Sequence, residues 1–167
     1  YFSGTKKVYL EPRVMANYHL NKHFTFKLNG GLYHQYINHI YGVRINNLQG
    51  LNTINWQLSN DSNKPVVESI QSSFGFIWDK SNWVVDVEAY YKQTNNITSG
   101  NFFTGDSVAH LVHGGYDNIG FDFLVKKKIK NFEAWMGYSY MDSEAKFDDI
   151  QFEYIWNQAH QLNFVLG

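Results

Sequence analysis

The sequence lacks cysteine and has no run of eighteen apolar residues within its 167 positions. The absence of cysteine excludes a disulfide framework and a thiolate metal site. The absence of a long apolar run excludes a transmembrane helix, and the mean hydropathy of -0.41 agrees with this. A strong charge of either sign is also lacking, because the formal net charge is -1. This balance gives no electrostatic reason to expect nucleic acid as a partner.

Aromatic residues, by contrast, are abundant: 12 Tyr, 13 Phe and 5 Trp make up 18% of the chain, about twice the average share. Several lie in segments where apolar and polar residues alternate, and residues 83–92 are the clearest case. One face of this segment carries Trp83, Val85, Val87, Ala89 and Tyr91. The other face carries Val84, Asp86, Glu88, Tyr90 and Lys92. This period of two predicts a strand with one apolar face and one more polar face.

The same alternation recurs along the chain. We expect seven strands, over residues 8–19, 24–36, 66–78, 83–94, 115–128, 132–142 and 158–167. Three tight turns at 20–23, 79–82 and 129–131 alternate with three long loops at 37–65, 95–113 and 143–157. Consecutive antiparallel strands place all the short turns at one end, which is typical of transmembrane β-barrels. A soluble β-sandwich, the alternative, usually mixes loop lengths at both ends.

The predicted fold class is therefore all-β: a transmembrane antiparallel up-and-down β-barrel, of which the chain holds about seven strands. Bacterial barrels close with an even number of strands, and the chain begins at Tyr1 and stops at Gly167 inside an alternating segment. We expect residues 1–167 to be a partial β-barrel domain of a longer protein rather than a complete eight-strand barrel. Within it, Pro12 predicts an edge strand or a bulge, and Gly30-Gly31 predicts a bulge or a close backbone approach.

The alternation also assigns side chains to lipid or to the lumen. Apolar residues on the outward faces are predicted to contact lipid: Val85, Val87, Phe121, Phe123, Met136 and Phe164. Charged residues on the inward faces are predicted to line the lumen: Glu11, Arg13, Asp86, Glu88, Asp122 and Lys126. These charges are interpreted either as part of a ligand path or as a ladder of paired charges, and the ladder is favoured.

Several short motifs, in order along almost the whole chain, carry a resemblance to a known family. They are LEPR at 10–13, KLNGGLYHQY at 27–36, NW at 82–83 with VEAYYK at 87–92, GFDFLVKKK at 120–128 and AHQLN at 159–163. Together they resemble the C-terminal part of the barrel of TonB-dependent outer-membrane receptors of the Bacteroidetes type.

This resemblance implies a barrel of about 22 strands that is closed by an N-terminal plug domain. It implies location in the bacterial outer membrane and import of a scarce ligand, such as a siderophore, glycan or peptide, powered by the TonB complex. Further expected partners are outer-membrane lipids and a surface lipoprotein or larger outer-membrane complex. Neither a plug nor a TonB box lies in this sequence. The alternative is a structural or binding barrel, an adhesin or an assembly subunit, without transport.

Two groups of residues at or beyond the strand ends are candidates for ligand contact. The aromatic group is Tyr33, Tyr36, Tyr41 and Trp56, whose rings can stack on a sugar or an aromatic siderophore. The alternative role is an aromatic girdle at the membrane interface, which is favoured for Trp78, Trp83 and Phe132 beside the short turns. The histidine group is His34, His39, His110 and His113.

The last two histidines are three residues apart, as some metal ligands are. Neither cysteine nor a close carboxylate completes a metal site, so ordinary loop histidines are favoured and no metal or other cofactor is expected. Enzyme activity is not expected either. The sequence has no G-x-S-x-G nucleophile elbow, and no motif pairs a serine with a histidine.

Overall fold

The computed structural model describes residues 7–44, 51–60, 62–100, 111–153 and 157–167, and these residues form strands and no helix. The strands are β1 (Arg13–His19), β2 (Phe24–Gln35), β3 (Ile37–Arg44), β4 (Leu51–Leu58), β5 (Val67–Lys80), β6 (Trp83–Gly100), β7 (Leu111–Ile129), β8 (Phe132–Phe147), β9 (Ile150–Glu153) and β10 (His160–Leu166). Within the described residues, no helix has the length and apolar character needed to span a bilayer.

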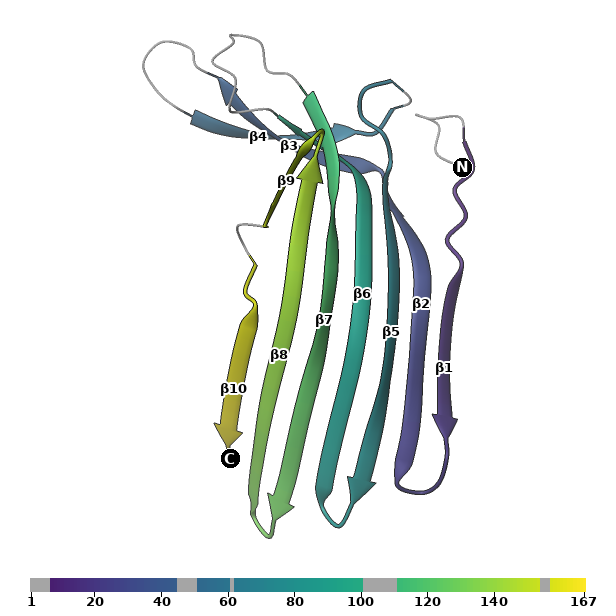
Figure 1. The fold of residues 1–167 in the computed structure, drawn as a ribbon, viewed down its shortest axis with the longest axis vertical. Coiled ribbons are helices and arrows are strands. Elements are labelled where there is room, and N and C mark those ends of the chain that lie inside the picture. Colours follow the sequence, from purple (N-terminus) through teal and green to yellow (C-terminus); the bar gives the residue numbers. More distant parts are fainter. Residues whose placement is uncertain (1–6, 45–50, 61, 101–110, 154–156) are drawn as a thin grey trace.

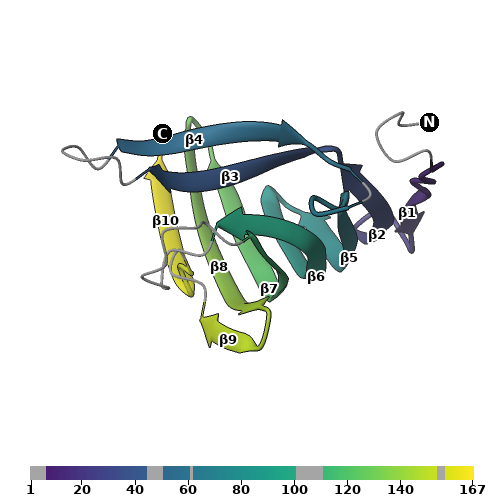
Figure 2. The same ribbon diagram turned by 90° about the horizontal axis from the view of Figure 1, so that it is seen from above.

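One large antiparallel sheet contains eight of the strands. Its order is β1-β2-β5-β6-β7-β8-β10, and the short strand β9 pairs with β8. The strands stand side by side as a tall wall, with β1 and β10 at opposite edges (Figure 1). Seen from above, the wall follows an open arc (Figure 2). The prediction of an all-β fold with antiparallel, up-and-down neighbours is confirmed, and the described sheet is not closed into a barrel.

The short turns lie where the sequence predicts them, at one end of the wall (Figure 1). Between β5 and β6, Ser81 and Asn82 have φ angles of 53° and 66°, the left-handed pair that a two-residue type I′ hairpin requires. Between β1 and β2, the side-chain Oδ1 of Asn21 accepts hydrogen bonds from the backbone N–H groups of His23 and Phe24, at 2.8 and 3.1 Å. Asparagine suits such turns because its side chain replaces a backbone acceptor.

The long loops are shorter in the structure than the sequence predicts. Residues 37–65, predicted as a loop, contain the hairpin β3–β4, which lies across the end of the wall (Figures 1 and 2). Strand β6 continues past residue 94 to Gly100, β7 begins at Leu111, and β8 extends to Phe147 before turning into β9. The ladder is built from backbone groups, so Asn-, Ser- and Thr-rich segments pair without showing apolar alternation.

The first strand begins later than predicted, at Arg13 instead of residue 8. Pro12 has no N–H to donate, and only its carbonyl joins the ladder, accepting from the N–H of Leu32 at 3.0 Å. Gly30 and Gly31 keep a regular register with β1 and β5, so no bulge forms there. The ring of Tyr33 instead lies over Gly31, where an added Cβ would come within 2.9 Å of it.

Buried hydrophobic side chains are few among the described residues, and they gather at the end that carries the hairpin. They are Ile40, Val66, Val67 and Ala145. Beside them, the buried side chain of Asn38 donates to Ser59 Oγ at 2.9 Å and to the carbonyl of Pro65 at 3.4 Å, and the second bond ties the hairpin to the segment just before β5. The wall itself therefore has no covered apolar core, and its apolar side chains lie elsewhere.

Candidate functional site

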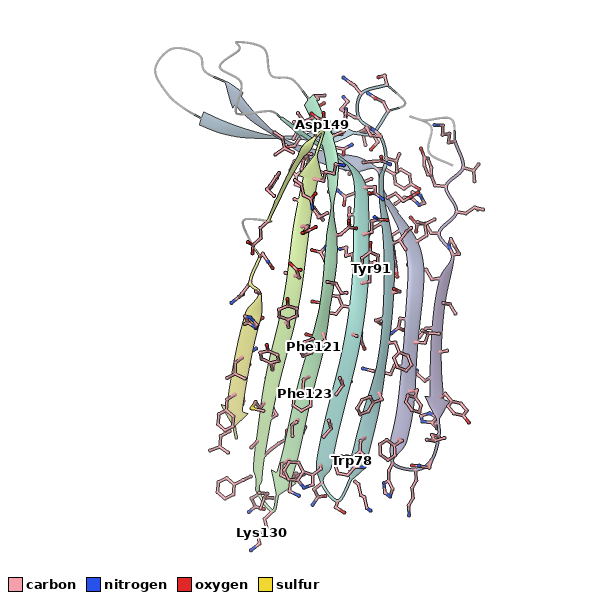
Figure 3. All side chains as sticks on the ribbon, in the orientation of Figure 1. Trp78, Tyr91, Phe121, Phe123, Lys130 and Asp149 are labelled. Carbon is pink, nitrogen blue, oxygen red and sulfur yellow. The ribbon has the colours of Figure 1, made fainter. Side chains whose placement is uncertain are left out.

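The wall has two chemically different faces, and the strand register defines both. We call the first the apolar face, and one row across it contains Tyr18, Phe26, Phe76, Val87, Phe123, Tyr138 and Leu162. The next row contains Ala16, Leu28, Phe74, Ala89, Phe121, Tyr140 and His160. Aromatic and aliphatic side chains thus cover this face from β1 to β10, as Figure 3 shows for Phe121 and Phe123 at mid-height.

The height of this face is close to that of a membrane. On β7 it runs from Ile119 to Ile129, ten residue steps that are interrupted only by Lys127. At about 3.4 Å per residue this is about 34 Å along the strand. The tilt of about 40° that strands have in transmembrane barrels would make such a band about 26 Å tall. Transmembrane barrels carry an apolar band about 25 Å tall between their aromatic girdles.

The apolar face is exposed along its whole width. Phe74 on β5 is 55% exposed, and Leu162 and Phe164 on β10 are 68% and 67% exposed. Such a contiguous patch is far larger than soluble monomers leave in contact with water. The register places all six residues predicted to face lipid on this face: Val85, Val87, Phe121, Phe123, Met136 and Phe164. Lipid contact itself stays a prediction.

The opposite face, which we call the polar face, carries paired charges. Lys27 on β2 reaches across β5 to Asp86 and Glu88 on β6, with Nζ–O distances of 2.7 and 2.9 Å. It can do so because the residue between them in the register is Gly75, which has no side chain. Lys126 on β7 pairs with Glu133 on β8 at 2.6 Å. Ion pairs thereby link β2 to β6 and β7 to β8.

Most of the residues predicted to line the lumen belong to this face. Asp86, Glu88, Asp122, Lys126 and Arg13 are on it, and Glu11 precedes β1 and pairs with Arg13 at 2.7 Å. The observed ion pairs favour the ladder interpretation for Asp86, Glu88 and Lys126. Asp122 is exposed and lies opposite Glu88 and Ser139 in the register.

At the end opposite the short turns, a histidine is enclosed by carboxylates. The His34 side chain is only 4% exposed, and its Nε2 lies 3.4 Å from Glu68 Oε2. Its Nδ1 lies 3.7 Å from Glu11 Oε1 and has no hydrogen-bond partner. The backbone N–H of His34 donates to the same Glu11 oxygen at 2.9 Å. This hydrogen bond, which partial burial opposes and Arg13 reinforces, lowers the pKa of Glu11 below its usual 4.5.

Aromatic rings continue this cluster into an open cleft. Tyr9 packs on His34 and on Tyr36, with ring centroids 4.9 and 5.7 Å away. The cleft has a volume of about 590 Å³ and is lined by His34, Gln35, Tyr36, Ile37 and Trp56. Trp56 is 66% exposed. An exposed indole beside a tyrosine and polar side chains suits stacking of a planar or ring-shaped ligand.

The eight residues predicted to contact ligand are thus only partly brought together. His34, Tyr36 and Trp56 converge on the cleft, whereas Tyr33 lies on the polar face beneath the guanidinium of Arg13, 4.5 Å from its ring centroid. His39 and Tyr41 are on β3, and His39 pairs with Trp56 in the register; their side chains are not described. His110 lies outside the described residues.

His113 belongs to a second cleft that the sequence does not predict. This cleft has a volume of about 750 Å³, spans the ends of β5 to β8, and includes Asp117, Glu144, Lys146 and Asp148 in its lining. It forms where β6 bulges between Thr94 and Ile97, with Asn96 at φ 64°. In the part of the chain that the structure describes, no three His, Asp or Glu side chains are placed to hold a metal ion.

Comparison of this chain with models of protein families, with curated proteins and with solved structures gives no match.

Proposed function

We propose that this chain forms part of the wall of a transmembrane β-barrel in the bacterial outer membrane. The exposed apolar face lies against lipid, and the polar face lines the lumen. The single observation that carries the proposal is the apolar band, about 34 Å long along β7, on one face of a sheet whose other face carries ion pairs.

A β-sandwich is the competing fold, and it requires a second sheet over the apolar face. The second sheet that the structure describes is the hairpin β3–β4, and it lies across the end of the wall. The apolar side chains in the middle of the wall remain exposed, as Phe74 and Leu162 do. Lipid is the solvent in which such an apolar face is stable. Once the wall is part of a closed barrel, its backbone groups are satisfied within the ladder, as the membrane interior requires.

Within the outer membrane, we propose that the chain is part of a TonB-dependent transporter that imports a scarce ligand. The support is the series of motifs between residues 10 and 163 that resemble this family. The two clefts at the long-loop end are where such a ligand would first be bound. The alternative is a binding barrel, such as an adhesin or an assembly subunit, which the same clefts would serve without transport.

The reading frame of the complete protein separates the two functions. An upstream plug domain of about 150 residues supports transport, since a plug gates the lumen of a large barrel. A barrel domain preceded by no plug, in a protein that still reaches the outer membrane, would favour the adhesin or assembly subunit.

Orientation in the membrane is tested by labelling single cysteines in intact cells with a reagent that does not cross membranes. We expect labelling of Asn63→Cys, beside the hairpin, and none of Lys22→Cys or Lys80→Cys in the short turns. The control is labelling in permeabilised cells, where all three positions should react because all three are exposed. Labelling restricted to the two turn positions would reverse the topology and remove the clefts from the ligand side.

A further inference from the structure

The short-turn end of the wall has an uneven charge. Residues 19–24, 78–84 and 126–134 contain six lysines and only two acidic residues, Asp79 and Glu133. The lysines are Lys22, Lys80, Lys126, Lys127, Lys128 and Lys130. The whole chain is nearly neutral, with a net charge of -1, so the positive charge is concentrated at this end. Lys130 lies at the tip of a short turn and Asp149 at the opposite end of the wall (Figure 3).

The two faces differ in whether acidic residues lie beside these lysines. Both acidic residues are on the polar face, where Glu133 pairs with Lys126 at 2.6 Å. On the apolar face, Lys80 and Lys127 flank Trp83 in one row of the register, and this part of the face carries no acidic residue. The positive charge at this end therefore borders the band of aromatic and aliphatic side chains.

Trp83 holds this row in a defined arrangement. The Nζ of Lys127 lies 4.4 Å from the centroid of the Trp83 ring and donates a hydrogen bond to the carbonyl of Ser81 at 3.2 Å. Trp83 itself is 40% exposed. Tryptophan prefers the membrane interface, and lysine extends its ammonium group from that level into the headgroups.

We propose that these five residues, Lys22, Lys80, Trp83, Lys127 and Lys130, form a basic rim that binds the phosphates of anionic phospholipids in the leaflet at the short-turn end. The inference rests on the proposed membrane-spanning function. A ligand for this rim must carry negative charge immediately beside an apolar layer at least one membrane leaflet thick. An anionic phospholipid provides both, with its phosphate at the lysines and its acyl chains along the apolar face.

The test uses the complete protein and compares its insertion into two kinds of vesicle, of phosphatidylcholine alone and of phosphatidylcholine with phosphatidylglycerol. We expect insertion to favour the anionic vesicles, and this preference to shrink in high salt because exposed charges are screened. In the double variant Lys80→Gln/Lys127→Gln, the preference for anionic vesicles is expected to fall about thirtyfold. Lys80→Arg/Lys127→Arg, which keeps the charge, should restore it.

The matched control is Lys7→Gln/Lys64→Gln, which removes two lysines at the long-loop end of the wall, one before β1 and one before β5, and should leave the preference unchanged. An equal loss in the control and in the rim variant would show that total charge matters and overturn the inference. If millimolar inorganic phosphate abolished the preference for anionic vesicles, the rim would be a general anion site instead of a lipid site, and this result too would overturn the inference. Failure to insert into both kinds of vesicle would instead overturn the proposed function, and the rim with it.

Discussion

At the scale of single residues, Val87 occupies the centre of the apolar face, between Phe76 and Phe123 in the register. We expect Val87→Arg to destabilise the protein in lipid by about 2–4 kcal/mol, because a guanidinium near the bilayer midplane loses its hydration. Ser139→Arg is the matched control: it introduces the same side chain at a similar depth on the polar face, beside Asp122. Reversible unfolding in urea from lipid vesicles measures both. A cost near zero for Val87→Arg would contradict lipid contact at this position.

Gly75 provides a second residue-scale prediction, because it lets Lys27 reach two strands across. A Cβ added there would collide with the carbonyl oxygen of Val87 and lie 3.0 Å from Glu88 Cα. We expect Gly75→Ala to cost about 1–3 kcal/mol, the range for overpacking.

The control for this substitution is Gly137→Ala, also on the polar face. An added Cβ there meets nothing closer than the Trp135 ring at 3.9 Å, so its cost should be small. Both variants are compared by unfolding in the same vesicles. If both variants lost the same free energy of unfolding, the close approach of β5 and β6 would not be the reason that glycine is required at position 75. Strand propensity would explain the loss instead.

At the scale of elements, strands in the apolar band could be predicted and those beyond it could not. Residues 83–94 alternate clearly, so the sequence places β6 there; from Asn95 to Gly100 both faces are polar and the period disappears. The hairpin β3–β4 escapes prediction for a different reason. In its second strand Ile54, Trp56 and Leu58 do alternate with polar residues, but the whole segment 37–65 is rich in Asn, Ser, Gly and Gln, which favours a loop. The enclosure of His34 depends on register, since Glu11 and Glu68 lie 23 and 34 positions away in the chain and nothing local links them.

The hairpin β3–β4 should be separable from the wall. Strands β2 and β5 pair directly over their whole length, and Gln35 is opposite Val67 where they end. Replacing residues 36–66 by Asn-Gly would close this pair with a two-residue turn. We expect the variant to fold into vesicles as the parent does, while losing Trp56 and the cleft. Loss of folding would show that the buried cluster around Ile40 and Val66 is required for the wall.

At the scale of the whole molecule, the wall has two edges, β1 and β10, which do not pair with each other. Each strand bonds to one neighbour, so about half of its backbone N–H groups point away from the described sheet. If the chain is part of a closed barrel, further strands must satisfy these groups, because lipid cannot.

In the complete protein in lipid, we therefore expect the outward N–H groups of β1 and β10 to exchange hydrogen as slowly as those of β6. Amide hydrogen exchange measures this, with residues 1–167 alone in detergent as the comparison, where the same outward groups should exchange orders of magnitude faster. Fast exchange at both edges in the complete protein would mean that the sheet stays open, and the barrel would have to be abandoned.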